Sequence, residues 1–255
     1  GARVYFVENH ALPIVDVQVD FAAGSSRDPA GKSGLAGFTH GLLDGGAGDL
    51  DETAISNRLA DLGANLGGGA DQDRASLSLR TLAARETRDG ALEIMRLVLQ
   101  QPRFPEAVLQ REQVRAVAGL RDALTKPEVL ASRAFWQALY PDHPYGRVST
   151  PESLESLTRA DVESFWRANY NAAKASVTLV GDLSRSEAEA IAEKLTAGLP
   201  AGGPAAPIPA ASLPQGRVVS VPHPATQSHL LLGLPAIPRG DPDFYALQVG
   251  NYVLG

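Results

Sequence analysis

Two stretches near the start of the chain have the hydrophobic pattern or composition of β-strands. Residues 4–7 and 14–21 are rich in β-branched and aromatic residues, and the second stretch alternates apolar with polar positions. A period of two is typical of a strand with one buried face. The two stretches therefore predict a hairpin-like pair of strands. Two further strands are predicted over residues 64–70 and 75–81, of which the second alternates in the same way.

Apolar residues recur at helical spacing through most of the chain between residues 35 and 197. This spacing places them on one face of a helix. Asp51, Thr158 and Ser184 stand in N-cap positions and mark the start of three such helices. The predicted helices lie near residues 35–43, 52–62, 85–100, 105–124, 130–139, 159–166 and 187–195, and one more strand is predicted at 176–181.

The order of these elements predicts an α+β fold. Strands come first, then a series of helices, then a strand and a helix, which indicates an antiparallel or mixed β-sheet with helices packed on one face. Residues 1–197 supply the elements of one complete domain.

A tract rich in Pro, Ala and Gly follows this domain. Residues 198–216 have no periodicity and are predicted to form a linker. Strands are then predicted at 217–221 and 228–234, followed by a helix from 241. Because some forty residues are too few for an independent core, we expect residues 217–255 to be the truncated start of a second domain.

Composition excludes several classes of function. The chain has 255 residues, with 23 Lys and Arg against 29 Asp and Glu, a net charge of −6 and no dense basic run. We therefore expect no nucleic-acid partner. Since no stretch approaches the roughly 20 apolar residues of a membrane span, none is expected. The absence of cysteine excludes disulfides, thiol nucleophiles and cysteine-based metal sites.

The compartment is left open by the cysteine count. The chain enters a strand-like pattern at once, without the layout of a signal peptide, so we expect that any targeting segment has been removed. An Ala/Gly/Arg-rich composition favours a bacterial source. A periplasmic or otherwise exported location is favoured over the cytoplasm.

Common catalytic motifs are missing from the sequence. The five histidines form no His-x-x-x-His or His-x-x-Glu-His pair, the spacing that places two zinc ligands on one helix face. There is no Gly-x-Ser-x-Gly nucleophile elbow. Gly67, Gly68 and Gly69 lie inside a predicted strand that follows a helix, which is the reverse of the order that a phosphate-binding loop requires.

One segment resembles the signature helix of the pitrilysin/insulinase family of zinc metallopeptidases. Residues 34–48 read Gly-Leu-Ala-Gly-Phe-Thr-His-Gly-Leu-Leu-Asp-Gly-Gly-Ala-Gly, whereas active members of that family read Gly-Leu-Ala-His-x-x-Glu-His before an apolar pair and a Gly-rich exit. Gly37 and Gly41 stand where the family has its two zinc histidines. His40 stands where the family has the glutamate that activates water.

The resemblance extends over nearly the whole chain. Arg111-Glu112 is similar to the start of the family's Glu-x6-Glu helix, in which Gly119 takes the place of the third zinc ligand. Residues 62–73 are similar to the family's edge strand, and residues 143–146, 150–154 and 180–182 follow its downstream pattern.

The resemblance implies a half-clamshell domain that has lost its catalytic centre. Because glycine offers no side-chain donor, Gly37, Gly41 and Gly119 cannot hold the zinc that the family uses, and no metal site or cofactor is expected. In the family, peptide adds to the edge strand by backbone pairing, which implies a peptide-binding edge here at Gly67, Gly68, Gly69 and Ala70. Irregularity of a glycine-rich strand explains the same residues equally well.

The leading hypothesis is a non-catalytic subunit that pairs with a zinc-bearing homologue and helps to enclose peptide. Two alternatives stay open. One is an active zinc peptidase with an unconventional site that uses His40 and Glu112. The other is a scaffold similar to the core subunits of respiratory complexes. For both side chains, the simpler interpretation is a polar residue on a helix face that binds no ligand.

Overall fold

The computed structural model describes residues 2–254, the side chain of Leu254 excepted. Its centre is a five-stranded sheet in the order β1-β7-β2-β6-β5. β1 and β7 run parallel, and the other neighbouring strands run antiparallel. The strands are β1 (Arg3–Glu8), β2 (Ile14–Phe21), β5 (Asn65–Ala70), β6 (Ala75–Leu82) and β7 (Ala175–Gly181). The sheet is therefore mixed, as the sequence predicts.

The alternation along each strand separates a buried face of the sheet from an open one. In β2, Val15, Val17 and Val19 are buried, while Gln18 between them is exposed. The strands that neighbour β2 have the same buried–open alternation. The hydrophobic core therefore lies between one face of the sheet and the helices.

The pairing predicted for the first two strands is wrong. β1 and β2 do not form a hairpin, because β7 lies between them and pairs with both. β7 comes from a part of the chain more than 150 residues later. Such a long-range partner leaves no local signal in the residues that connect β1 to β2.

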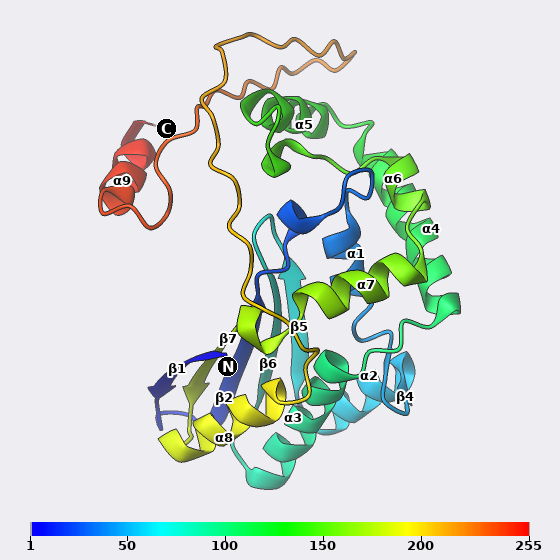
Figure 1. Ribbon diagram of the computed structural model, residues 1–255, viewed down its shortest axis with the longest axis vertical. Helices are drawn as coiled ribbons and strands as arrows, with labels where there is room; N and C mark the ends of the chain where they lie inside the picture. Colours follow the sequence, from blue (N-terminus) through cyan, green and yellow to red (C-terminus); the bar gives the residue numbers. More distant parts are fainter. Residues whose placement is uncertain (1, 255) are drawn as a thin grey trace.

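The helices cover the buried face of the sheet and one end of it (Figure 1). α3 and α8 pack together, α3 against β6 and α8 against β1, and α1 lies against β5. The three predicted N-caps are confirmed, since the side chains of Asp51, Thr158 and Ser184 each accept a backbone N–H of the helix that follows. The helices are α1 (Leu35–Gly41), α2 (Glu52–Asp61), α3 (Arg85–Gln100), α4 (Glu106–Ala123), α5 (Pro127–Leu139), α6 (Pro151–Glu155), α7 (Arg159–Asn169), α8 (Arg185–Thr196) and α9 (Phe244–Leu254).

Several short elements escape the sequence prediction. A two-stranded ladder, β3 (Gly46–Ala47) and β4 (Leu50–Asp51), connects α1 to α2. Three 3₁₀ turns are η1 (Ser25–Arg27), η2 (Pro144–Gly146) and η3 (Ala172–Lys174). Elements of two or three residues are too short to show a hydrophobic period.

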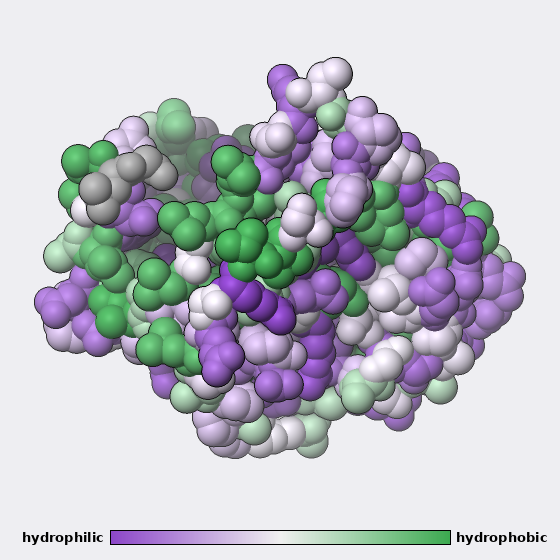
Figure 2. Space-filling model, turned by 90° about the horizontal axis from the view of Figure 1, so that it is seen from above, coloured by the Kyte–Doolittle hydropathy of each residue, from purple (hydrophilic) through white to green (hydrophobic). Residues whose placement is uncertain are grey.

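Residues 198–240, the C-terminal arm, run past α5 and lead to α9, which lies apart from the sheet (Figure 1). The strands predicted at 217–221 and 228–234 are wrong for the described residues, in which both segments lack a strand. A strand needs a partner for its backbone groups, and neither segment pairs with a described strand. Apolar side chains here stay exposed, and Figure 2 shows hydrophobic residues gathered on the side of the molecule where α9 lies.

No helix within residues 2–254 is both long enough and apolar enough to cross a bilayer. The division into a first domain, a linker and a second domain stays a prediction.

Candidate functional site

Helix α1 carries the residues that resemble the zinc-binding motif. Leu35, Ala36, Phe38 and Thr39 face the core and fix the orientation of the helix. The opposite face is therefore turned outward, and Gly37 and Gly41 lie on it, exposed and one helical turn apart.

Asp28 fixes the start of this helix from a distance. The N-cap residue of α1 is a glycine without a capping side chain. The carboxylate of Asp28 replaces that cap by accepting the backbone N–H groups of Gly34 and Ala36, each at 2.8 Å. Burial raises the pKa of Asp28 to about 6, although both hydrogen bonds lower it. No pattern in the sequence points to Asp28, since it lies six residues before the N-cap position that it serves.

All three positions that resemble zinc ligands are open to solvent. Gly119 lies on the exposed face of α4, and it is exposed to solvent like Gly37 and Gly41. Beyond the chain neighbours and the helix's own backbone, no atom of residues 2–254 comes within 4 Å of the place where a Cβ would stand on any of the three. The helices therefore have room for side chains at these three positions. Because all three residues are glycines, none of them supplies a side-chain donor atom to a metal.

His40 is hydrogen-bonded to the sheet. Its Nε2 lies 2.9 Å from the carbonyl oxygen of Ser76 in β6. A carbonyl oxygen accepts, so Nε2 carries the proton and donates. His40 therefore connects the last turn of α1 to the β5–β6 hairpin.

Glu112 is held by arginines. Its Oε1 accepts from Arg111 at 2.7 Å and from Arg115 at 2.9 Å, and Arg111 also pairs with Glu52. Near this cluster, burial raises the pKa of Asp44, and the charges of Glu52 and Glu112 raise it further. The surroundings of this cluster are acidic, and both Glu52 and Glu112 are paired with arginines.

The donor set does not fit a catalytic zinc ion. Such an ion needs three protein ligands and a water molecule. Within the described part of the chain, no three His, Cys, Asp or Glu side chains are grouped so that they could hold a metal ion. His40 and Glu112, the two donors beside the expected ligand positions in the sequence, each have protein partners already.

Strand β5 forms the free edge of the sheet beside α1. Gly67, Gly69 and Ala70 are exposed, and β6 is the strand that pairs with β5. The backbone groups on the other side of β5 are turned toward solvent. An extended peptide can add to such an edge by main-chain hydrogen bonds, without help from particular side chains.

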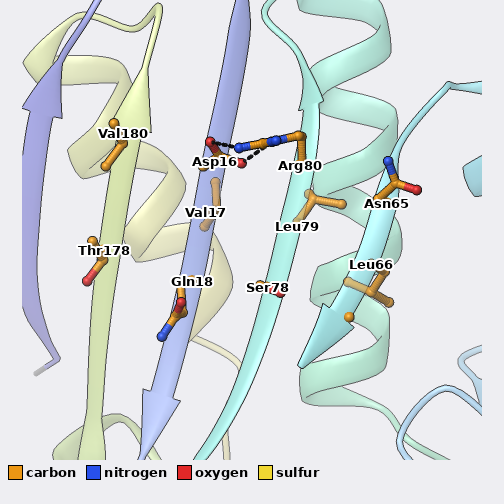
Figure 3. A pocket seen from close by; sticks show the side chains of 11 residues that line it. Asp16, Val17, Gln18, Asn65, Leu66, Ser78, Leu79, Arg80, Thr178 and Val180 are labelled. Carbon is orange, nitrogen blue, oxygen red and sulfur yellow. Dashed lines mark hydrogen bonds and ion pairs between the residues drawn. The ribbon is translucent and has the colours of Figure 1, made fainter. Parts of the chain in front are cut away.

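The open face of the sheet carries polar side chains next to this edge. Figure 3 shows a hollow across β7, β2, β6 and β5, in which Asp16 and Arg80 point toward each other from neighbouring strands. Arg80 donates to both oxygens of Asp16, at 2.7 and 2.9 Å. Ser78 and Gln18 lie next to this pair, and Gly67 of β5 also lines the hollow.

The turn between β5 and β6 is held by Tyr145, which lies in the segment 143–146 that resembles the family's downstream pattern. The hydroxyl of Tyr145, in η2, donates to Asp73 at the tip of this turn. Burial and that hydrogen bond raise the pKa of Tyr145, which keeps the hydroxyl protonated. The signal in the sequence was the segment His143-Pro144-Tyr145-Gly146, but its partner could not be found without the fold.

Comparison with known proteins identifies the family. A family model described as "Insulinase (Peptidase family M16)" matches residues 3–149, and one described as "Peptidase M16 inactive domain" matches residues 156–255. The chain belongs to peptidase family M16. Its α+β fold and its resemblance to pitrilysin and insulinase are thereby confirmed.

Individual relatives match most of this chain. The crystal structure of a peptidase M16 inactive domain from Pseudomonas fluorescens is 39% identical, with a TM-score of 0.82 over 84% of this chain and 52% of that one. The "Non-peptidase homolog YmxG" of Helicobacter pylori is 24% identical over 71% of this chain and 42% of its own length. A probable mitochondrial-processing peptidase subunit beta of Arabidopsis thaliana is 20% identical over 76% and 37%. The chain thus spans about half, or less, of the length of these relatives.

Proposed function

We propose that this chain is a non-catalytic M16 protein that pairs with a zinc-bearing homologue and helps to hold peptide substrate. The observation that carries the proposal is the set of three solvent-exposed glycines, Gly37, Gly41 and Gly119, at the positions of the family's zinc ligands. A chain without these donors lacks zinc, and zinc is what activates water in an M16 peptidase.

A role in holding peptide is supported by the intact edge strand. β5 lies beside α1, as a peptide-binding edge next to a catalytic helix would. Gly67, Gly68 and Gly69 have no side chains, so nothing bulky on these residues hinders access to the outer backbone groups of β5. Because recognition by strand addition relies on the main chain, it survives the loss of the catalytic residues.

The first experiment measures zinc content and peptide hydrolysis by the purified chain. After loading with zinc and desalting, we expect no stoichiometric metal by elemental analysis and no chelator-sensitive cleavage of a quenched fluorescent peptide. Stoichiometric zinc together with such cleavage would overturn the proposal and would favour the unconventional site at His40 and Glu112.

The second experiment tests the partner. Mixed with an M16 homologue that has an intact His-x-x-Glu-His motif, the chain is expected to co-elute in gel filtration and to increase peptide hydrolysis by that homologue. A homologue variant without its zinc ligands is the control for background cleavage. A stable complex in which hydrolysis does not depend on this chain would support the scaffold function instead.

A further inference from the structure

His40 occupies the position of the family's catalytic glutamate, and it is bound to the sheet. Its imidazole leaves the last turn of α1 and donates from Nε2 to the carbonyl oxygen of Ser76, at 2.9 Å. The two residues are 36 positions apart in the sequence, so the bond connects two separate elements. The side chain is half-buried, so solvent competes little for this bond.

The chemistry of this contact requires a donor. A carbonyl oxygen accepts hydrogen bonds, and the imidazole Nε2–H supplies one. A glutamate at the same position would be ionised and could only accept, so it would repel the Ser76 carbonyl. The exchange of glutamate for histidine therefore creates a contact that the catalytic residue could not make.

The contact lies beside the three consecutive glycines of β5. Ser76 stands opposite Gly69 in the ladder. A Cβ on Gly68 would lie 1.9 Å from the Ser76 oxygen and 3.0 Å from Nε2 of His40, and Gly68 has a φ of +148°. The imidazole of His40, the carbonyl group of Ser76 and the backbone of Gly68 thus lie close together. Three consecutive glycines give a strand with large conformational freedom, which must be restricted before a peptide can pair with its edge.

We propose that His40 is a positioning residue, which holds the glycine-rich edge strand β5 in place through the Ser76 carbonyl so that the outer edge of β5 is ready to pair with peptide. The proposal rests on the proposed function in so far as β5 binds peptide. The stabilisation of β5 is a property of the free protein, however, and can be measured without any peptide.

Hydrogen exchange of the free chain tests the proposal. We compare the backbone amides of β5 that pair with β6 in the wild type and in three variants, His40→Ala, His40→Glu and His40→Gln. Loss of one hydrogen bond is expected to speed their exchange about five- to tenfold in His40→Ala, and at least as much in His40→Glu. His40→Gln keeps an N–H donor and is expected to stay close to the wild type. Amides in β2 and β7 serve as internal references and are expected to be unchanged.

The matched control is His10→Ala. His10 is also hydrogen-bonded, to Glu8 and Asp182, but it lies at the β1 side of the sheet, far from β5. Exchange in β5 is expected to be unchanged by this variant. Unaltered β5 exchange in His40→Ala would overturn the proposal, and so would an equal increase in all strands, which would indicate global destabilisation.

Peptide binding separates the proposal from the proposed function. If β5 holds peptide, affinity for an extended peptide is expected to fall in His40→Ala and His40→Glu, and to be retained in His40→Gln. If the wild type binds no peptide while the exchange result is as expected, the proposed function fails and the positioning of β5 by His40 stands.

Discussion

At the scale of single residues, the buried carboxyl group of Asp28 makes stability depend on pH. It is 3% exposed, and burial raises its pKa to about 6, above the usual value of 3.8. The folded state therefore binds this proton more tightly than the unfolded state does, and the stability that protonation gives is lost as the pH rises from 4 to 6. The shift corresponds to about 3 kcal/mol at most.

The measurement compares urea unfolding of the wild type and Asp28→Asn between pH 4 and 7. Relative to the variant, the wild type is expected to lose stability as the pH rises, because asparagine does not titrate. The exposed Asp49→Asn serves as the control and should follow the wild type. Parallel curves for wild type and Asp28→Asn would contradict the raised pKa.

At the scale of elements, α4 carries a glycine in its interior. Gly119 is exposed, lies within α4, and has open space around the position where a Cβ would stand. Because glycine costs about 1 kcal/mol relative to alanine inside a helix, Gly119→Ala is expected to raise the free energy of unfolding by about 0.5–1 kcal/mol. Urea unfolding measures the change. Gly68→Ala is the contrasting variant and should destabilise the chain, since its Cβ would meet the Ser76 carbonyl. A destabilised Gly119→Ala would indicate a contact that α4 makes through this glycine.

The same scale explains which elements the sequence predicts. The helices that begin at Asp51, Thr158 and Ser184 are found where expected, because a cap and an apolar face are encoded within a few residues. The pairing of β1 with β7 could not be predicted in this way, because it joins residues that are far apart in the chain. Likewise, the residues that resemble zinc ligands could be named from the motif, whereas the bond from His40 to Ser76 required the fold.

At the scale of the whole molecule, the three positions that resemble the family's zinc ligands lie on two separate helices. Gly37 and Gly41 come from α1 and Gly119 comes from α4, two helices that the common core positions. All three positions have open space for a side chain, so donors could be introduced there without a clash.

Restoring the donors tests this view directly. The triple variant Gly37→His, Gly41→His and Gly119→Glu is expected to bind zinc stoichiometrically, measured by elemental analysis after desalting, because three ligands and a water complete a zinc site. The double variant without Gly119→Glu is the control and should bind more weakly. A folded triple variant without zinc would show that α1 and α4 do not meet at ligand distance. With His40 in place of the family's glutamate and its Nε2 donating to Ser76, the triple variant has no carboxylate to activate water, so metal binding without peptide hydrolysis is expected. Adding His40→Glu supplies that base and removes the bond to Ser76, so any activity gained is expected to come with faster exchange in β5.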